Sequence, residues 1–207
     1  MDAYERERQD LVTTLRAAGP DAPTLCAGWR TRHLAAHLLL RLHHPVQLAA
    51  AVLPGSADAD TRTSDLAATA TEPEQYQRLL DRFAAPAAPL NPMGWGGNRL
   101  HLVEYVVHHE DVRRATGQPA NRDLPQPMQE ELWRQLRTFA RLTQARAETG
   151  VVLVVPGGPR AVVRRGRRSI AVSGMPVELA LYLTGRTAHA DVQVIATKPR
   201  PRALHRR

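Results

Sequence analysis

Residues 98–117, NRLHLVEYVVHHEDVRRATG, form one apolar face and one narrow polar stripe when they are placed on an α-helix. The stripe carries a histidine or a carboxylate at four positions, His101, Glu104, His108 and Asp111. The polar side of a surface helix ordinarily mixes in lysine, arginine and glutamine. Glu104 and His108 are four residues apart, so a helix brings their side chains to one point. The stretch therefore predicts a helix that forms one wall of a site.

The residues of this stripe suit a metal ion. Zinc binds imidazole nitrogen and carboxylate oxygen at about 2.0 to 2.2 Å. Glu104 and His108 supply two ligands, so a third must come from another element. In RHLAAHLLLR, residues 32–41, His37 lies on an otherwise apolar helix surface. A lone histidine in a core is more often a satisfied hydrogen-bonding group, but three protein ligands would leave a fourth position for water or substrate.

Helical patterns dominate the first 147 residues. They are expected at about residues 2–18, 31–53, 73–84, 98–116 and 126–146, with Thr31 as a plausible N-cap, a kink or break at Pro45 and loops at 54–72 and 86–97. Four longer helices and a short one in this span indicate a bundle.

The pattern changes after Gly150. Short β-branched runs at 151–155, 161–165 and 169–174 are separated by PGGP and RGRR, which signal hairpins, and a helix at 175–185 and a strand at 191–197 follow. The predicted fold class is mainly α. A four-helix bundle over residues 1–148 would carry a small α+β domain over residues 149–207 that ends in a basic tail.

Composition limits the classes of partner. The chain has 207 residues, one cysteine, Cys26, and a formal charge of +8. A single cysteine, a charged N-terminus without a signal peptide and no apolar run of about 20 residues predict a cytoplasmic protein that does not enter a membrane. The arginine runs lack the interleaved aromatic residues that bind single strands, so no nucleic-acid partner is expected. No base neighbours Cys26 in the sequence, and we expect a structural cysteine there.

Two segments together resemble a known family. LCAGWRTRHLAAHLLLR, residues 25–41, followed by the stretch at 98–117 resembles the DinB-like superfamily, and more closely its actinobacterial branch with the metal-binding domain of mycothiol-dependent maleylpyruvate isomerase. The resemblance implies a divalent metal, usually zinc, held by His37, Glu104 and His108.

The resemblance extends to the C-terminal region and includes a departure. VSGMPVELALYLTGR, residues 172–186, resembles the sterol-carrier-like domain of the same proteins and matches Arg186 to a functional arginine. An arginine after a glycine at a helix end could equally cap that helix. The family often has aspartate where this chain has His33. We expect His33 to cap the helix or support the site rather than bind the metal.

The sequence and the resemblance together predict a metal-dependent enzyme. It would activate a low-molecular-weight thiol such as mycothiol, or water, for transfer to or isomerisation of a small electrophilic or anionic substrate. Asp111 would support a ligand or accept a proton, and Arg186 would hold an anionic substrate. Two alternatives stay open at this point, namely a non-catalytic metal-binding or metal-sensing protein and a metal-dependent hydrolase that uses no thiol.

Overall fold

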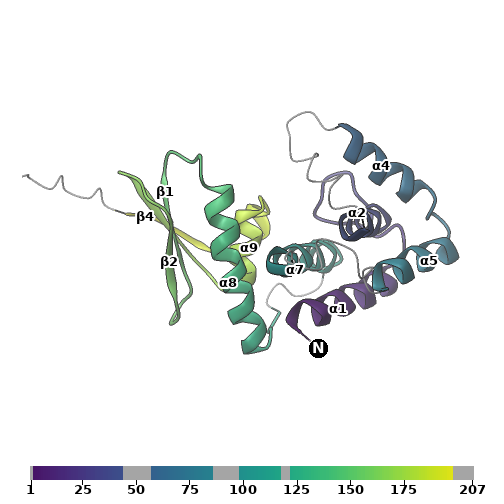
Figure 1. Cartoon of the computed structure of the whole chain (residues 1–207), viewed down its shortest axis with the longest axis horizontal. Coiled ribbons are helices and arrows are strands. Elements are labelled where there is room, and N and C mark those ends of the chain that lie inside the picture. The colour runs from purple at the N-terminus through teal and green to yellow at the C-terminus, as the bar shows by residue number, and fades with distance from the viewer. Residues whose placement is uncertain (1, 44–56, 86–97, 118–121, 198–207) are drawn as a thin grey trace, which may run out of the picture. The chain divides into compact units, whose positions relative to one another are not determined.

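The computed structural model describes residues 2–43, 57–85, 98–117 and 122–197. The chain divides into two compact units, Met1–Asp123 and Leu124–Arg207 (Figure 1). The expected kink at Pro45, the loop at 86–97 and the basic tail after residue 197 lie outside the described residues. None of the described helices is both long enough and apolar enough to cross a membrane.

The N-terminal unit is helical. Its described residues form α1 (Ala3–Ala18), α2 (Thr31–His43), α4 (Ala57–Ala68), α5 (Pro73–Ala84) and α7 (Asn98–Ala115). The mainly α fold class is thus confirmed, and the predicted helices at 2–18, 73–84 and 98–116 are each present within two residues of their expected ends. The core holds leucines from α1 and α2 together with Tyr76, Phe83 and Tyr105.

Local sequence explains where the helices begin. Asp2 caps α1, because its carboxylate accepts the backbone N–H of Glu5 at 2.8 Å. Thr31 was expected to cap α2, but it is the first helical residue, and its hydroxyl donates to the carbonyl of Gly19. His33 acts at this helix start instead, since its Nδ1 accepts the backbone N–H of Arg30 at 3.1 Å.

The loop expected at 54–72 is a wrong prediction, because α4 occupies most of it. The segment ADADTRTSDLAA has few large apolar residues, which led to the prediction of a loop. Alanine has the highest helix propensity, however, and the helix packs on α2. Thr63, Ala67 and Ala70 are buried there. Small side chains allow close packing with little hydrophobic signal in the sequence.

The C-terminal unit contains a four-stranded sheet. Its elements are α8 (Gln126–Thr143), β1 (Gly150–Val154), β2 (Arg160–Arg164), β3 (Ser169–Ser173), α9 (Pro176–Leu183), the 3-10 helix η2 (Thr187–His189) and β4 (Gln193–Thr197). The strand order is β2-β1-β3-β4. Helices α8 and α9 lie on the same side of this sheet (Figure 1).

The sheet differs from the expected series of hairpins. PGGP joins β1 and β2 as an antiparallel hairpin, as predicted, but β3 pairs with β1 in parallel and does not pair with β2. The link from β2 to β3 therefore passes the start of β1. Gly150 and Gly166 make this approach possible, because a Cβ on Gly166 would lie 2.5 Å from the backbone nitrogen of Gly150.

The division of the chain also differs from the expected boundary at 148/149. Helix α8 was assigned to the bundle by its strong amphipathic pattern. It packs on α9 and β2 and belongs to the C-terminal unit, so the units divide one helix earlier, between Asp123 and Leu124. An amphipathic pattern shows that a helix buries one face, but it does not show which partner covers that face.

Candidate metal centre

Helix α7 places Glu104 and His108 one turn apart, and α2 brings His37 to the same point. The Nε2 atom of His37 lies 3.6 Å from Oε1 of Glu104. The rings of His37 and His108 meet edge to face, with centroids 5.3 Å apart. One donor atom from each of the three residues lies within 4.8 Å of the other two. The structure thus brings together all three residues that were predicted as ligands.

The separation of His37 and Glu104 fits two ligands of one metal ion. Two ligands bound tetrahedrally at about 2.1 Å would lie about 3.4 Å apart. The separation of 3.6 Å between His37 and Glu104 is close to this value and longer than a good hydrogen bond. Burial lowers the pKa of His37, although the Glu104 carboxylate opposes this effect. A lowered pKa favours the neutral imidazole that a metal requires.

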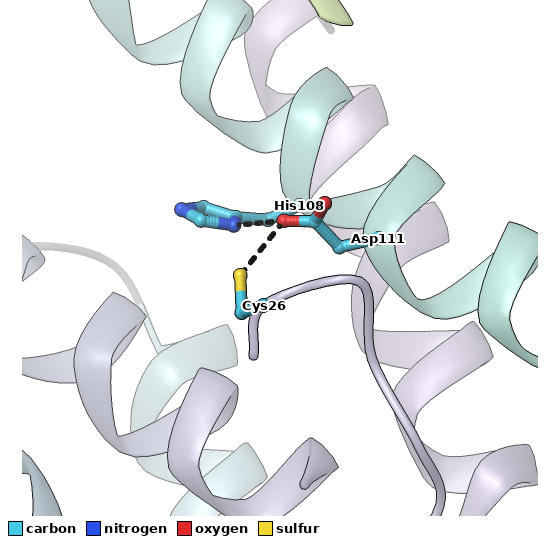
Figure 2. A group of neighbouring side chains, drawn as sticks. All are labelled: Cys26, His108 and Asp111. Atoms are coloured by element: carbon cyan, nitrogen blue, oxygen red, sulfur yellow. Dashed lines mark hydrogen bonds and ion pairs between the residues drawn. The ribbon is translucent and has the colours of Figure 1, made fainter. Parts of the chain in front are cut away.

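Asp111 lies behind His108 and orients it. The carboxylate is fully buried, and its Oδ2 accepts the Nδ1–H of His108 at 2.8 Å (Figure 2). With its proton on Nδ1, the ring has its other nitrogen, Nε2, available as a ligand. A carboxylate that fixes a metal-binding histidine in this way is a common second partner in metal sites.

Arg41 also contacts the ligand set. It lies one turn after His37 on α2, and its Nε forms an ion pair with Oε1 of Glu104. The guanidinium therefore competes with a metal for the same carboxylate oxygen. Arg41 was not predicted from the sequence, although its spacing of four residues from His37 places it on the same face of α2.

Cys26 was expected to be a structural cysteine, and its position beside the candidate metal centre was not predicted from the sequence. The loop before α2 places its Sγ 3.2 Å from Oδ2 of Asp111, the oxygen that accepts His108 (Figure 2). Cys26, His108 and Asp111 form a second group whose donor atoms lie within 4.8 Å of one another. The sequence could not reveal this contact, because it joins residues 85 positions apart.

The two other residues singled out from the sequence are placed differently. His33 contacts the backbone at the start of α2, as described above, which is the capping role expected of it. Arg186 lies in the C-terminal unit, where its guanidinium donates to the carbonyl of Thr184 at 2.8 Å. Its backbone N–H donates to Leu181, and Gly185 before it has a φ of 87°, the arrangement of a Schellman motif. A role for Arg186 toward substrate stays a prediction.

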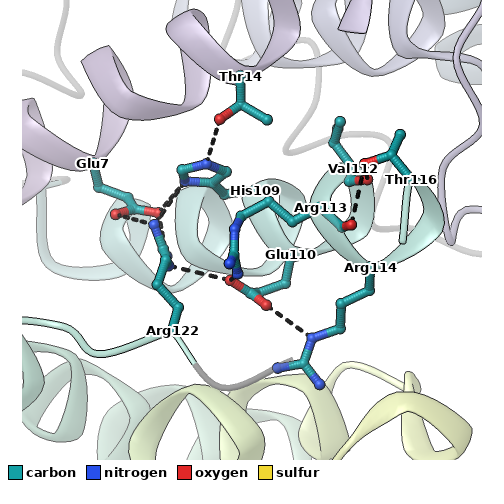
Figure 3. A network of polar contacts seen from close by, with 9 residues as sticks. All are labelled: Glu7, Thr14, His109, Glu110, Val112, Arg113, Arg114, Thr116 and Arg122. Atoms are coloured by element: carbon teal, nitrogen blue, oxygen red, sulfur yellow. Dashed lines mark hydrogen bonds and ion pairs between the residues drawn. The ribbon is translucent and has the colours of Figure 1, made fainter. Parts of the chain in front are cut away.

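A second polar network lies on another face of α7 (Figure 3). His109 pairs through Nδ1 with Oε1 of Glu7 at 2.8 Å, and its Nε2 accepts the hydroxyl of Thr14 at 2.8 Å. Arg122 donates to both oxygens of Glu7, at 2.6 and 3.0 Å, and lies 3.2 Å from Glu110.

The network continues along the helix. Arg113 and Arg114 complete it by donating to the two oxygens of Glu110, at 2.7 and 2.8 Å. Every carboxylate here is matched by arginine or histidine at hydrogen-bond distance, so the network ties α1 to α7.

Residues 2–94 match the family described as "Mycothiol maleylpyruvate isomerase N-terminal domain". The resemblance predicted from the sequence is thereby confirmed, with His37 inside the matched region and Glu104 and His108 beyond its end. No curated protein matches the chain significantly.

Solved structures support the same fold for the whole chain. One is a crystal structure of the mycothiol-dependent maleylpyruvate isomerase, with a TM-score of 0.61 and 16% identity, and the match covers 96% of this chain and 92% of that one. Another is a histidine-to-alanine mutant of the mycothiol-dependent maleylpyruvate isomerase, with a TM-score of 0.59, 15% identity and coverage of 97% and 95%. At this identity the likeness shows the fold, including the small C-terminal domain.

Proposed function

We propose that this chain is a metal-dependent, thiol-using enzyme of the mycothiol-dependent maleylpyruvate isomerase type that works in the cytoplasm. The observation that supports this most is the convergence of His37, Glu104 and His108, with donor atoms within 4.8 Å of one another, in a chain whose residues 2–94 match that family. The substrate would be a small, electrophilic and anionic molecule, as maleylpyruvate is for the structurally similar isomerase.

Each residue of the centre has a defined task. His37, Glu104 and His108 would hold a divalent metal, and the nitrogen and oxygen donors favour zinc. Asp111 keeps the proton of His108 on Nδ1. Two neutral imidazoles and one carboxylate leave a net charge of +1 on a divalent ion, which would attract a thiolate or a carboxylate.

The chemistry that this site supports is nucleophilic addition. A bound divalent metal supplies Lewis acidity, which lowers the pKa of a coordinated thiol or water toward neutrality. Arg41 places a further positive charge beside Glu104, and Arg186 would bind a carboxylate in two-point fashion. Addition of a thiol to a conjugated double bond, rotation about the resulting single bond and loss of the thiol would isomerise the substrate without a net redox change.

The proposal is tested by metal content and turnover in the same preparations. Wild-type protein should contain about one metal per chain by elemental analysis, and His37→Ala and His108→Ala should contain none. His109→Ala is the matched control, because that neighbouring histidine lies in the other network. Turnover of maleylpyruvate to its trans isomer should require both the metal and mycothiol.

Other outcomes would select the alternatives. Metal-dependent turnover of a small ester or amide without thiol would indicate a hydrolase, and metal binding without turnover would indicate a binding or sensing protein. Equal metal content in all four preparations would reject the site. Arg186→Lys should reduce turnover with unchanged metal content, whereas loss of folding would leave Arg186 with only its role at the end of α9.

A further inference from the structure

Cys26 lies in a well-defined place beside the candidate metal centre. The backbone N–H of Leu25 donates to the carbonyl of Asp111 at 3.0 Å, and the N–H of Cys26 donates to the hydroxyl of Thr24 at 3.2 Å. The loop is thus fixed to α7 by its backbone. Within this frame the thiol donates to Oδ2 of Asp111 at 3.2 Å.

The distances argue against a second metal at Cys26. Zinc bound by nitrogen at about 2.0 Å, by oxygen at about 2.0 Å and by sulfur at about 2.3 Å would hold these donors about 3.3 to 3.6 Å apart. His108 and Asp111 are 2.8 Å apart, and Asp111 and Cys26 are 3.2 Å apart, which are the lengths of hydrogen bonds.

The geometry also argues against a catalytic nucleophile. A nucleophilic cysteine gives its proton to an imidazole, and a carboxylate orients that imidazole from its far side. Here the thiol of Cys26 and the Nδ1–H of His108 both donate to Oδ2 of Asp111, so this ring nitrogen already carries a proton and cannot accept that of the thiol (Figure 2). Cys26 therefore affects His108 only through the oxygen of Asp111 that both of them bond.

We infer that Cys26 is a positioning residue that acts through Asp111 on His108. The thiol and the ring N–H both donate to Oδ2, so they fix the rotation of a carboxylate that is fully buried. The fixed carboxylate keeps the proton of His108 on Nδ1 and directs Nε2 to the ligand set. The part of this inference that concerns metal affinity rests on the proposed function.

The physical basis is the cost of a buried carboxylate that loses a donor. Asp111 without the thiol would keep its bond to His108 but would be held less firmly, because the bond from Cys26 to Oδ2 would be missing. Residues that orient a metal ligand are commonly worth about 10–100-fold in metal affinity. Cys26 is separated from His108 by one more hydrogen bond than Asp111 is, so its effect on metal affinity should lie at the lower end of that range.

The test compares Cys26→Ala with Cys26→Ser in the full chain. Zinc affinity, measured by competition with a chelating dye, should fall about tenfold in Cys26→Ala. It should stay within about threefold of wild type in Cys26→Ser, which retains an O–H donor. The visible absorption of the cobalt-substituted protein should shift in the alanine variant and return in the serine variant.

Two results would overturn the inference while leaving the proposed function intact. One is an unchanged zinc affinity and cobalt spectrum in Cys26→Ala. The other is equal impairment in both variants, which would show that the size of the sulfur matters rather than its proton. Failure of the wild-type protein to bind zinc or cobalt would instead reject the metal centre, and the positioning role with it.

Discussion

His108 and His109 are neighbours on α7, yet they belong to two networks with different geometry. His109 pairs with Glu7 at 2.8 Å, and Arg122 neutralises the same carboxylate. On the other face, the ligand set of His108 pairs His37 with Glu104 at 3.6 Å, too long for a good hydrogen bond and suitable for two ligands of one ion. His108 also bonds Asp111 at 2.8 Å, so the pair that departs from hydrogen-bond geometry is His37 with Glu104, and this departure supports the proposed metal site.

One helix can thus both hold two elements of the fold together and present the residues of the candidate metal site. The carboxylate of Glu7 on α1 is paired with both His109 and Arg122, so this network fixes the position of α7 relative to α1. That fixed helix then presents Glu104 and His108 at a constant spacing. Removing a residue from the first network should affect stability, whereas removing one from the ligand set should affect metal binding.

The largest expected effect tests this separation directly. His108→Ala should weaken metal binding by more than about 100-fold, since it removes a ligand rather than a supporting partner. His109→Ala should leave the affinity for the metal nearly unchanged but should reduce stability, because Glu7 would lose one of its partners. Isothermal titration with zinc and urea unfolding of both metal-free variants would measure the two effects. A comparable loss of zinc affinity in both variants would contradict the division.

The next effect concerns the stability of the N-terminal unit. Glu7→Gln would leave the guanidinium of Arg122 with only Glu110 as a carboxylate partner in the described network. Breaking a buried ion pair commonly costs about 3 to 5 kcal/mol, and the remaining partner places this case near the lower value. Thermal and urea unfolding should show the loss, while zinc affinity should not change. A stability change below about 1 kcal/mol would show that the network is solvated in solution.

The sequence predicted the grouping of His37, Glu104 and His108 better than it predicted the chain around them, and their role as metal ligands stays a prediction. His37, Glu104 and His108 could be found because helical periodicity fixes which residues share a face, and because the stripe contained only ligand types. The partner of a helix is set by tertiary packing, which periodicity does not contain. For that reason α8 was assigned to the bundle, and the Cys26–Asp111 contact was missed. Helix α4 was missed because small side chains give little hydrophobic contrast.

The contribution of Glu7 to stability should also depend on pH. Burial raises the pKa of Glu7, but the hydrogen bond from His109 and the charge of Arg122 outweigh it and hold the pKa below the ordinary value of 4.5. A lowered pKa means that the unfolded chain binds the proton first as the pH falls. Glu7 therefore contributes stability above about pH 4.5, and this contribution is lost as the pH falls through the pKa of the folded protein.

The measurement is urea unfolding of wild type and Glu7→Gln between pH 3 and pH 7. The difference in unfolding free energy between the two proteins should be largest near neutral pH and should shrink below about pH 4.5. A difference that stays constant across this range would show that the Glu7 carboxylate does not titrate with folding.

A smaller effect is expected at Arg41. Its guanidinium forms an ion pair with the Glu104 oxygen that would bind the metal, so the metal must share or displace that contact. Arg41→Gln removes the competing charge and should increase zinc affinity by severalfold, up to about tenfold for roughly 1.4 kcal/mol. The increase should diminish at high salt, because screening weakens the contribution of a partly exposed charge. A decrease in affinity would show that Arg41 holds Glu104 in its ligating position.

The smallest effect is expected at His33, which lies one turn before His37 on α2. Its Nδ1 accepts the N–H of Arg30, so its role is at the helix start rather than in the ligand set. Aspartate accepts the same kind of bond and places a negative charge at the positive end of the helix. His33→Asp should therefore keep zinc affinity within about twofold and stability within about 0.5 kcal/mol of wild type. A loss of zinc comparable to that of His37→Ala would make His33 a ligand, and the ligand set carried over from the family would be wrong.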